Sequence, residues 1–524
     1  MKAKSIMVQG TGSDVGKSIL VCALCRIFHQ DGLKVAPFKA QNMSLNSYVT
    51  LDGREMGRAQ VAQAEAAGIH PTVEMNPILL KPTGNNGSQV ITMGKPIGHM
   101  TANEYYQNKN TMLDIAKNAF EALKEQYEII VIEGAGSPSE INIKDDDIVN
   151  MKIAEIANAP VLLMTDIERG GAFAWVVGTC ELLNNNEKER ICGVIINKFR
   201  GDMEILKTGI SMLENKINKP VLGVIPYFND IKIDNEDSVC LESANYKSET
   251  IDYDSVKNCI DVVVIRLPRI SNFTDFDLLK YEKDVRVRFV DRAQAIGKPD
   301  LVILPGTKNT IGDLQSIKEN GIAETIIELK KKGTMVIGIC GGYQMLGKII
   351  TDPENTESKI SQIEGLGLFD AFTTFIPEKK TYQVKAKMYD NPASRTGLSG
   401  KNFNTKCEII GYEIHMGETE LLNGTLPFLK IIERSGKKVN LDDGAISKDG
   451  NVIGTYLHGI FDNDEFRLGL INHLRGIKGL IPLLPDELLK AKREKEKQYD
   501  RLADLIRKHV KMDLIYDLIG ELKN

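Results

Sequence analysis

The feature that most constrains the fold of this chain is a repeated alternation of short apolar runs with longer stretches of helical periodicity. In the first half the apolar runs are SIMVQ, KVAPF, EIIVIEG, APVLLMTD, ICGVIIN and KPVLGVIP, and helices are expected between them, including Lys17–Gln30, Glu55–Ala67, Ala102–Glu125 and Ala172–Leu183. Strands that alternate with helices form βαβ units, in which the strands are parallel. The alternation lapses after Tyr227 and resumes with IDVVVIRLP, DLVILPGT and GTMVIGICGG. The sequence therefore predicts an α/β fold of two domains, each built on a mostly parallel sheet.

The same pattern predicts how the chain is divided. We expect a first domain over residues 1–227, a connector over 228–258, a second domain over 259–484 and a C-terminal helical segment over 485–524. The connector is polar and acidic, with room for a short strand. Apolar residues recur every three to five positions between Leu502 and Leu522, which is typical of an amphipathic helix that packs against a domain.

Composition excludes several classes of protein. A chain of 524 residues with 42% hydrophobic and 26% charged residues has the make-up of a globular protein of more than one domain. Its net charge of −5 favours no general binding of nucleic acid or membranes, so we expect neither as a partner. The N-terminal apolar run is too short for a signal peptide, and no run approaches the roughly 18 apolar residues of a membrane span.

Cysteine usage indicates a reducing, cytoplasmic location. Eight cysteines in 524 residues are too few for a disulfide framework. Cys22 and Cys25 form a single CxxC, with no second pair. We expect these two thiols to pack inside a helix rather than to bind a metal.

The segment GTGSDVGKS, residues 10–18, is a variant of a phosphate-binding loop. Gly16, Lys17 and Ser18 match the end of the P-loop pattern, but Thr11 occupies the position of its first glycine. A strand precedes the segment and a helix follows it, so backbone N–H groups and the helix dipole would face a phosphate. The expected nucleotide-binding residues are Thr11, Gly12, Ser13, Gly16, Lys17 and Ser18, with Lys17 on the β- and γ-phosphates and the Ser18 hydroxyl on Mg²⁺.

Two acidic residues are further candidates for binding Mg²⁺. Glu133 ends the apolar run EIIVIEG, at the edge where open α/β sheets bind their ligands. The alternative for Glu133 is an acid that caps a turn. Asp147, in DDDIVNM, is expected near the metal or near a carboxylate that accepts the phosphoryl group.

A second constellation lies in the run VIGICGGYQMLG. Gly338, Cys340 and Gly342 form G-x-C-x-G, the nucleophile-elbow pattern with cysteine in place of serine. Glycines permit the sharp turn that exposes the side chain, and the N-terminus of the following helix favours a thiolate. The backbone amide of Gly341 can donate to an oxyanion. The pattern therefore predicts that Cys340 is a nucleophile.

A thiol nucleophile needs a base, and two histidines of the second domain follow apolar strands. His458, in GTYLHGIFD, is the preferred base. His415, in GYEIHMGE, could instead belong to an interface or to the phosphorylation substrate.

The variant loop and the later VIEGAGS resemble those of the dethiobiotin-synthetase-like ATPases. This resemblance implies that the first domain uses ATP and Mg²⁺ to activate a carboxylate as an acyl phosphate, which nitrogen then displaces. The related partition ATPases usually carry lysine at the position of Gly12, and this chain does not.

The elbow, the later histidine and the run LPGTKN resemble the triad-type glutamine amidotransferases. The resemblance implies a flavodoxin-like α/β domain in which Cys340 attacks glutamine, a thioester forms and ammonia leaves. It also implies that Gly306 supplies a second oxyanion amide. The family's usual acid lies two residues after the histidine, where this chain has Ile460, so Asp462, Glu465, the backbone or a water remain alternatives for orienting His458.

Ten stretches in the same order resemble the cobyric acid synthase family over essentially the whole chain. They are VQGTGSDVGKS, FKAQNMSLNSYVTLDGREMGRAQ, MNPILLKPTG, VIEGAGSPSEIN, DIVNM, GVIINKFRGD, LPGTKNT, GICGGYQMLG, GYEIHMG and GTYLHGIFDNDEFR. The resemblance implies glutamine- and ATP-dependent amidation of the b, d, e and g carboxylates of adenosylcobyrinic acid a,c-diamide. Two alternatives remain, the sibling enzyme that amidates the a and c carboxylates and a partition-type ATPase fused to a glutaminase-like module.

The segments FKAQNMSLNS and DGREMGRAQVAQ are the expected site for this corrinoid. They follow the second strand and combine basic with amide side chains, which suits a polycarboxylate whose other side chains are already amides. The candidate residues are Lys39, Gln41, Asn42, Asn46, Arg54, Arg58 and Gln60. The alternative is that these are ordinary polar loops and a solvated helix face.

Overall fold

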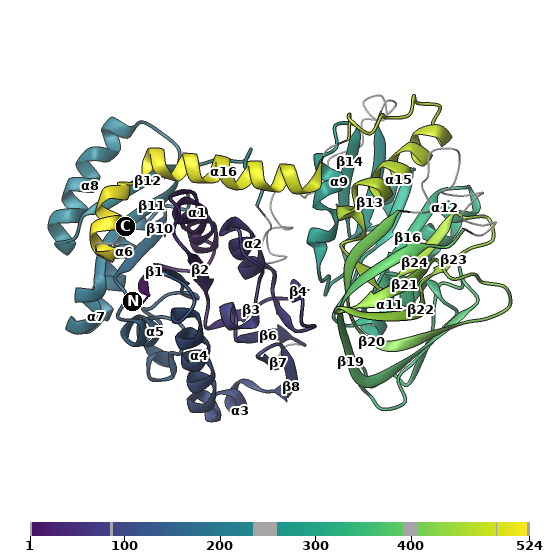
Figure 1. Cartoon of the computed structure of the whole chain (residues 1–524), viewed down its shortest axis with the longest axis horizontal. Coiled ribbons are helices and arrows are strands. Elements are labelled where there is room, and N and C mark those ends of the chain that lie inside the picture. Colours follow the sequence, from purple (N-terminus) through teal and green to yellow (C-terminus); the bar gives the residue numbers. More distant parts are fainter. Residues whose placement is uncertain (1–2, 84–86, 234–258, 391–406, 489, 521–524) are drawn as a thin grey trace. The chain divides into compact units, whose positions relative to one another are not determined.

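The structure, a computed structural model, describes residues 3–83, 87–233, 259–390, 407–488 and 490–520 (Figure 1). The chain forms two compact units. The first comprises Met1–Ser44, Glu55–Glu236 and Arg493–Asn524, and the second comprises Leu45–Arg54 and Asp237–Lys492. Residues 234–258 of the predicted connector, including its possible strand, and Leu522 lie outside the described residues.

The first unit is built on a six-stranded parallel sheet in the order β12-β11-β10-β1-β9-β2. The strands are β1 (Lys4–Gly10), β2 (Val35–Phe38), β9 (Ile129–Glu133), β10 (Val161–Asp166), β11 (Ile191–Phe199) and β12 (Val221–Pro226). Every residue of β9 and β10 is buried, as in parallel sheets that are covered on both faces. These are the six strands that the apolar runs of the first half predict.

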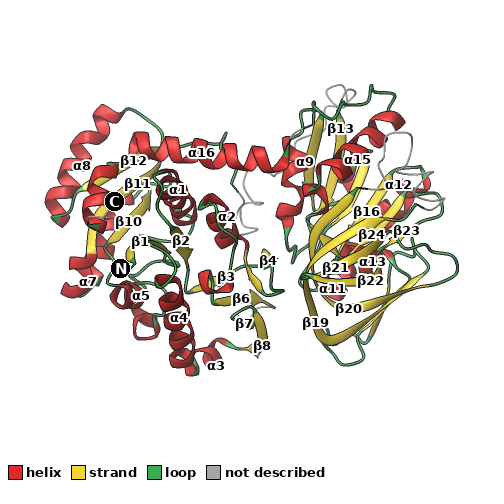
Figure 2. Cartoon of the chain, in the orientation of Figure 1, coloured by secondary structure: helices red, strands yellow, loops and turns green. Residues whose placement is uncertain are grey.

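Helices and short strands complete this unit (Figure 2). The helices are α1 (Lys17–Gln30), α2 (Arg58–Ala66), η1 (Val73–Met75), α3 (Ala102–Gln107), α4 (Lys109–Lys124), η2 (Ile141–Asp146), α5 (Met151–Ala157), α6 (Ala172–Leu182), α7 (Asn185–Arg190), α8 (Met203–Ile217), α16 (Ala491–His509) and α17 (Met512–Ile519). A second sheet has the order β3-β6-β7-β8, from strands β3 (Gln41–Met43), β6 (Ile78–Pro82), β7 (Ser88–Thr92) and β8 (Lys95–Met100). Within the described ranges, no helix is long and apolar enough to cross a membrane.

Two predicted helices differ from those observed. The helix expected from Glu55 begins three residues later, because Glu55–Gly57 form the short strand β5. The helix expected over Ala102–Glu125 is broken at Asn108, whose side-chain amide donates to the carbonyl of Glu104 at 2.8 Å. Asparagine side chains compete in this way with the backbone hydrogen bonds that would continue a helix.

The C-terminal helices belong to the first unit rather than forming a separate segment. Leu502, Ile506 and Ile515 are buried in one core with residues of α1 and β1. Arg26 on α1 pairs with Glu496 at 2.7 Å and with Asp500 at 2.8 Å. The amphipathic pattern thus predicts that this helix packs against a domain. The predicted boundary at residue 485 sets the helix apart as a separate segment, whereas Arg493–Asn524 belong to the first unit.

The second unit contains two sheets. The first has the order β14-β13-β15-β16-β24-β23, and all its pairings are parallel except that of β23 with β24. Its strands are β13 (Ile260–Ile265), β14 (Val285–Val290), β15 (Leu301–Leu304), β16 (Met335–Ile339), β23 (Ala445–Ile446) and β24 (Val452–Thr455). This sheet and the one in the first unit confirm the predicted α/β class with two mostly parallel sheets.

The second sheet of this unit is dominated by two long antiparallel strands, β19 (Ala371–Met388) and β20 (Glu408–Leu421). Its other strands are β17 (Ile349–Thr351), β18 (Gln362–Glu364), β21 (Leu429–Arg434), β22 (Lys437–Asp443) and β25 (Leu457–His458). The helices of the unit are η5 (Phe273–Phe276), α9 (Asp277–Tyr281), α10 (Ala293–Ile296), α11 (Thr310–Glu319), α12 (Ile322–Lys331), α13 (Gly341–Leu346), η6 (Ile460–Asp462) and α15 (Asp464–Ile477). Both sheets share a single hydrophobic core.

The segment Leu45–Arg54, with the short strand β4 (Ser47–Val49), also belongs to the second unit. The sequence places it in the first domain, so the predicted boundary differs here as well. The physical reason is hydrogen bonding between the backbone of the segment and side chains of the second unit. The Ser47 amide donates to the Asn272 side chain at 3.0 Å, and the Gly53 carbonyl accepts from the Thr381 hydroxyl at 2.8 Å.

Candidate active sites

The loop between β1 and α1 holds its shape through one glycine and one threonine. Gly16 has φ of 106°, and a Cβ atom there would lie 2.3 Å from the side-chain amide of Asn197. That amide donates to the carbonyl of Val15 at 2.8 Å. Thr11 donates two hydrogen bonds to β10. Its backbone amide donates to the Met164 carbonyl at 2.9 Å, and its hydroxyl donates to the Thr165 hydroxyl at 3.1 Å. The residue that departs from the P-loop pattern therefore fastens the loop to the neighbouring strand.

The Lys17 side chain lies between two glycine-rich loops. Its ammonium group donates to the carbonyl of Gly12 at 2.8 Å and to that of Gly136, in the loop after β9, at 3.1 Å. The sequence prediction did not include Lys198, whose ammonium group donates to the Asp14 carbonyl at 2.7 Å and pairs with Asp166 at 2.8 Å. Two lysines thus bond the backbone of the predicted phosphate loop.

Glu133 is the centre of a buried polar cluster at the end of β9. Its carboxylate accepts from the Ser18 hydroxyl at 2.8 Å, from Lys39 at 2.8 Å and from Gln63 at 2.5 Å. The structure thus brings together Ser18 and Glu133, which the sequence predicts as metal ligands, and it pairs Glu133 with Lys39, which the sequence predicts as a substrate residue.

The pair Ser18 and Glu133 fits a magnesium site of the nucleotide-dependent kind. Mg²⁺ prefers hard oxygen ligands and commonly takes only one or two from the protein, the others coming from phosphates and water. No cluster of three or more metal-ligating side chains occurs in the described part of the chain, so an all-protein cage is not available there. Asp147 makes different hydrogen bonds from this pair. Its carboxylate accepts from the backbone amides of Val149 and Asn150, each at 2.8 Å.

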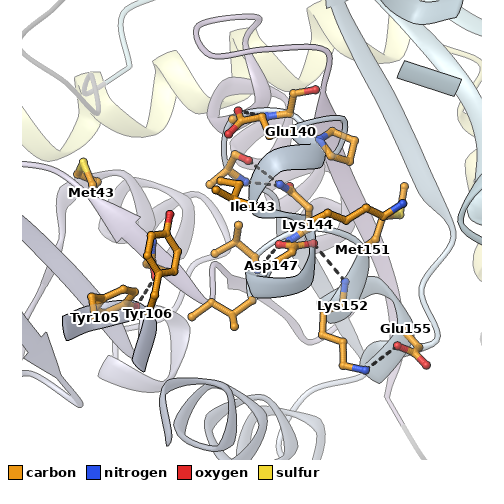
Figure 3. Close-up of a pocket in the computed structure, with 18 of the residues that line it drawn as sticks. Met43, Tyr105, Tyr106, Glu140, Ile143, Lys144, Asp147, Met151, Lys152 and Glu155 are labelled. Carbon is orange, nitrogen blue, oxygen red and sulfur yellow. Dashed lines mark hydrogen bonds and ion pairs between the residues drawn. The ribbon is translucent and has the colours of Figure 1, made fainter. Parts of the chain in front are cut away.

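A cavity of about 1670 Å³ lies within the first unit. Figure 3 shows Met43, Tyr105 and Tyr106 on one side of it, and Lys144, Asp147 and Lys152 on the other. Its wall includes the loop Ala135–Pro138, and so includes the residue whose carbonyl accepts from Lys17. Ligand pockets for drug-sized molecules measure roughly 300–1,000 Å³, so this cavity suits a larger molecule.

The predicted substrate residues separate into three groups. Gln41 lines the cavity and accepts a hydrogen bond from Tyr105. Lys39, Asn42, Arg58 and Gln60 are buried, and the Asn42 amide donates to Gln60 at 3.0 Å. Asn46 and Arg54 belong to the second unit. The seven residues therefore differ in their burial and in the unit to which they belong.

Cys340 occupies the strained turn between β16 and α13. Its φ of 52° and ψ of −110° are unusual for a residue that has a Cβ atom. The neighbouring glycines allow this turn to pack, since a Cβ atom on Gly342 would lie 2.0 Å from the Leu304 carbonyl and one on Gly341 would lie 2.8 Å from Thr307. The thiol is 3.6 Å from the carbonyl oxygen of Ile414.

His458 lies beside this thiol and is held on its other side by Asp275. Nδ1 of His458 is 2.7 Å from a carboxylate oxygen of Asp275, and the amide of Gly459 donates to the other oxygen at 3.2 Å. Burial lowers the pKa of His458, but the charge and hydrogen bond of Asp275 and the hydrogen bond with Cys340 outweigh it and raise the pKa to about 10. The elbow cysteine, the histidine and an acid thus form a buried triad.

The sequence prediction missed Asp275. It considered Asp462 and Glu465, which are close to His458 in the chain, whereas Asp275 lies in η5 after the first strand of the unit. The signal available in the sequence was that Asp275 is an acid soon after the apolar run IDVVVIRLP. Asp275 is far from His458 along the chain, so the sequence gave no reason to choose it.

His415 is built into the core. Its ring stacks on Tyr456 with ring centroids 3.7 Å apart, and Nδ1 is 3.2 Å from the Gly417 carbonyl. Burial lowers the pKa of His415 to about 3, so the ring is neutral at physiological pH. Gly306 lies at the triad, because a Cβ atom there would be 3.0 Å from Cε1 of His458.

Comparison with known proteins agrees with this pair of sites. Residues 6–239 match the family described as the CobQ/CobB/MinD/ParA nucleotide binding domain, and residues 261–466 match the CobB/CobQ-like glutamine amidotransferase domain. The fold and the sites therefore define a glutamine amidotransferase joined to a nucleotide-binding domain.

Similarity over the whole chain identifies the family. The chain is 50% identical over 523 residues to a cobyric acid synthase of Thermoanaerobacter sp., with all of both chains covered. It is 51% identical to that of Desulforamulus reducens, over 99% of this chain and 98% of the relative, and 50% identical to that of Clostridium tetani, over 99% of each. The chain belongs to the cobyric acid synthase family.

Proposed function

We propose that the chain uses ATP and glutamine to amidate the b, d, e and g carboxylates of adenosylcobyrinic acid a,c-diamide, forming adenosylcobyric acid in cobalamin biosynthesis. The observation that carries the proposal is the occurrence, in one chain of this family, of a Cys340–His458–Asp275 triad and a phosphate loop with a buried acid. One site releases ammonia from glutamine, and the other activates the carboxylate that receives it.

At the glutaminase site, Cys340 is the nucleophile and His458 the base. Asp275 and Cys340 together raise the pKa of His458 to about 10, which suits His458 to act as the base that takes the thiol proton. The thiolate attacks the carboxamide carbon of glutamine, and the amides of Gly341 and Gly306 would donate to the oxyanion. His458 then protonates the departing ammonia, and water hydrolyses the glutamyl thioester.

At the ATP site, the loop residues Thr11, Gly12, Ser13, Gly16, Lys17 and Ser18 bind the phosphates. Lys17 exchanges its carbonyl partners for phosphate oxygens, which its position between Gly12 and Gly136 supports. Ser18 and Glu133 would hold Mg²⁺, which neutralises charge on the phosphates during transfer. Asp147 lines the cavity, and there it would orient the acceptor carboxylate.

The corrinoid occupies the cavity beside this loop. A corrinoid is a large, mostly apolar ring with polar side chains, and the cavity combines size with Tyr105, Tyr106 and Met43 on one side and charged residues on the other. Gly136 lines the cavity and bonds Lys17, so a carboxylate at this end would lie beside the phosphate-binding lysine. Proximity of this kind favours direct phosphoryl transfer.

The test is amidation by the purified full-length chain with ATP, Mg²⁺ and glutamine. The a,c-diamide should gain amides that mass spectrometry counts, with one ATP consumed for each. Cobyrinic acid, offered in its place, tests the sibling reaction at the a and c positions. ATP hydrolysis without any amidation of either corrinoid would instead support a regulatory ATPase.

A further inference from the structure

A carboxylate outside the triad lies at the start of a helix in the glutaminase unit. Glu357 belongs to the loop between β17 and β18. Its Oε2 atom accepts from the backbone amides of the first two residues of α11, Thr310 at 2.9 Å and Ile311 at 3.4 Å. Within the described ranges these are the only hydrogen bonds of the carboxylate, so its Oε1 atom accepts none there.

The loop that carries Glu357 is held by a second acid. The Asp352 carboxylate accepts from three amides of this loop, at 2.7 Å, 2.8 Å and 2.8 Å, those of Thr356, Glu357 and Ser358. Asp352 is fully buried, so these hydrogen bonds are shielded from water and fix the turn. The fold therefore determines where the Glu357 side chain lies.

The charge of Glu357 lacks a close cationic partner. Burial raises the pKa of the carboxyl to about 7, although the hydrogen bond from Thr310 and the charge of Lys308 lower it. The nearby charge of Asp352 raises the pKa further. No ion pair of Glu357 occurs among the residues that the structure describes. A carboxylate withdrawn from water without a cation is costly, and such groups cluster at binding and catalytic sites.

Thr310 links this carboxylate to the nucleophile elbow. Its hydroxyl donates to Oε1 of Gln344 at 3.1 Å, and the amide of Gln344 donates to the carbonyl of Cys340 at 3.1 Å. The same hydroxyl oxygen would lie 3.0 Å from a Cβ atom on Gly341, the residue whose amide would donate to the oxyanion. A single residue, Thr310, therefore lies between Glu357 and the elbow.

The substrate of this site carries one cation of its own, the α-ammonium group of glutamine. When the carboxamide carbon of glutamine lies at the Cys340 sulfur, two methylene groups separate that carbon from the α-carbon. The α-ammonium group then lies about one residue's span from the elbow, which is comparable to the separation that Thr310 gives to Glu357.

We propose that Glu357 binds the α-ammonium group of glutamine through its Oε1 atom. This inference rests on the proposed function, since it needs glutamine at Cys340. It makes Glu357 a specificity residue, which separates glutamine from amides that lack this cation. The ammonium group in turn supplies the positive charge that the carboxylate lacks. A hydrogen bond between charged groups of this kind strengthens binding about 10- to 100-fold.

The experiment compares wild type with Glu357→Gln in the full chain. The nitrogen donors are glutamine and glutaramate, which is glutamine without its α-ammonium group. The variant removes the charge of residue 357, but its side-chain carbonyl can still accept from the amides of Thr310 and Ile311. The readouts are kcat and KM for each donor and the rate of ammonia-dependent amidation. A further readout is the concentration of each donor that halves the alkylation of Cys340 by iodoacetamide, measured on its peptide by mass.

We expect Glu357→Gln to raise KM for glutamine about 10- to 100-fold and to change kcat less than about threefold. KM for glutaramate should agree between wild type and variant within about twofold, because this donor has no cation to lose. Ammonia-dependent amidation should be unchanged. The matched control is Glu354→Gln, which alters an exposed acid of the same loop and should behave as wild type.

An equal rise in KM for glutamine and glutaramate would overturn the inference, because Glu357 would then support the site without contacting the cation. An unchanged KM for glutamine would also overturn it. If wild type amidates no corrinoid with any nitrogen source, the proposed function fails instead, and protection of Cys340 from alkylation decides the inference alone. Weaker protection by glutamine but not by glutaramate in Glu357→Gln supports it, and any other pattern overturns it.

Discussion

His458 and Asp275 lie 2.7 Å apart, Nδ1 to carboxylate oxygen, although 183 residues separate them in the chain. Both side chains are almost wholly buried, at 1% and 5% exposure. A charged hydrogen bond out of water is strong and fixes the ring geometry. This pair therefore determines which imidazole nitrogen faces Cys340 and how firmly the imidazole holds a proton.

Asp275→Asn should abolish glutamine hydrolysis. Loss of the carboxylate removes the main support for the raised pKa of His458 and permits the wrong tautomer, and the equivalent change in a Ser-His-Asp triad lowers kcat about 10⁴-fold. Ammonia-dependent amidation should survive and shows that the variant is folded. Asp462→Asn is the matched control, and a larger loss there than at Asp275 would reverse the assignment.

The raised pKa of His458 also predicts a dependence of stability on pH. The folded-state pKa of about 10 exceeds the unfolded value of about 6.5, so protonation stabilises the fold. This contribution is complete below pH 6.5 and is lost as the pH rises through 10. Thermal unfolding of wild type and His458→Gln, compared between pH 6 and pH 10, should show a difference that shrinks with pH. A difference that grows instead would contradict the protonated pair.

Cys340→Ala should separate the two half-reactions. The thiol is needed only to release ammonia from glutamine, so the variant should fail with glutamine and yet amidate the corrinoid when ammonium salt is supplied at alkaline pH. The rescue should increase with pH, because free ammonia is the nucleophile. Failure with both nitrogen sources in a folded protein that binds ATP would mean that Cys340 serves the amidation site itself.

Glu133→Gln should weaken the use of Mg²⁺. The substitution removes the charge that Ser18 and Lys39 share, and we expect the Mg²⁺ concentration for half-maximal amidation to rise about tenfold or more. Titration of ammonia-dependent amidation with Mg²⁺ measures this, and Glu121→Gln on the exposed face of α4 is the control. An unchanged titration curve would show that Glu133 is structural.

Gln41→Ala tests the acceptor cavity. Gln41 lines the cavity and is bonded by Tyr105, so its loss should raise KM for the corrinoid about tenfold while KM for ATP stays unchanged. Gln126→Ala, an exposed glutamine at the end of α4, is the control. Steady-state kinetics with each substrate varied in turn measure both KM values. A change in the KM for ATP alone would contradict the cavity as the acceptor site.

The local sequence determined the helices and strands. In each site it also determined the residues that lie together on a single loop. Apolar runs and their spacing indicated the six strands of the first sheet, and glycines around Lys17 and Cys340 indicated two turns with exposed functional groups. These features depend on interactions between near neighbours, namely the helix and strand periods and the freedom of glycine. The fold class and the family were accessible for that reason.

Only the tertiary structure decided which distant residues complete the sites. Asp275 reaches His458 because η5 and β25 meet in the folded unit, whereas the acids that the sequence offered, Asp462 and Glu465, are those closest to His458 along the chain. Lys39, a candidate for the substrate, pairs with Glu133, and Leu45–Arg54 joins the glutaminase unit through hydrogen bonds to the side chains of Asn272 and Thr381, which are distant in the chain. Pairings of this kind depend on how strands assemble in space, and residue order along the chain does not specify them.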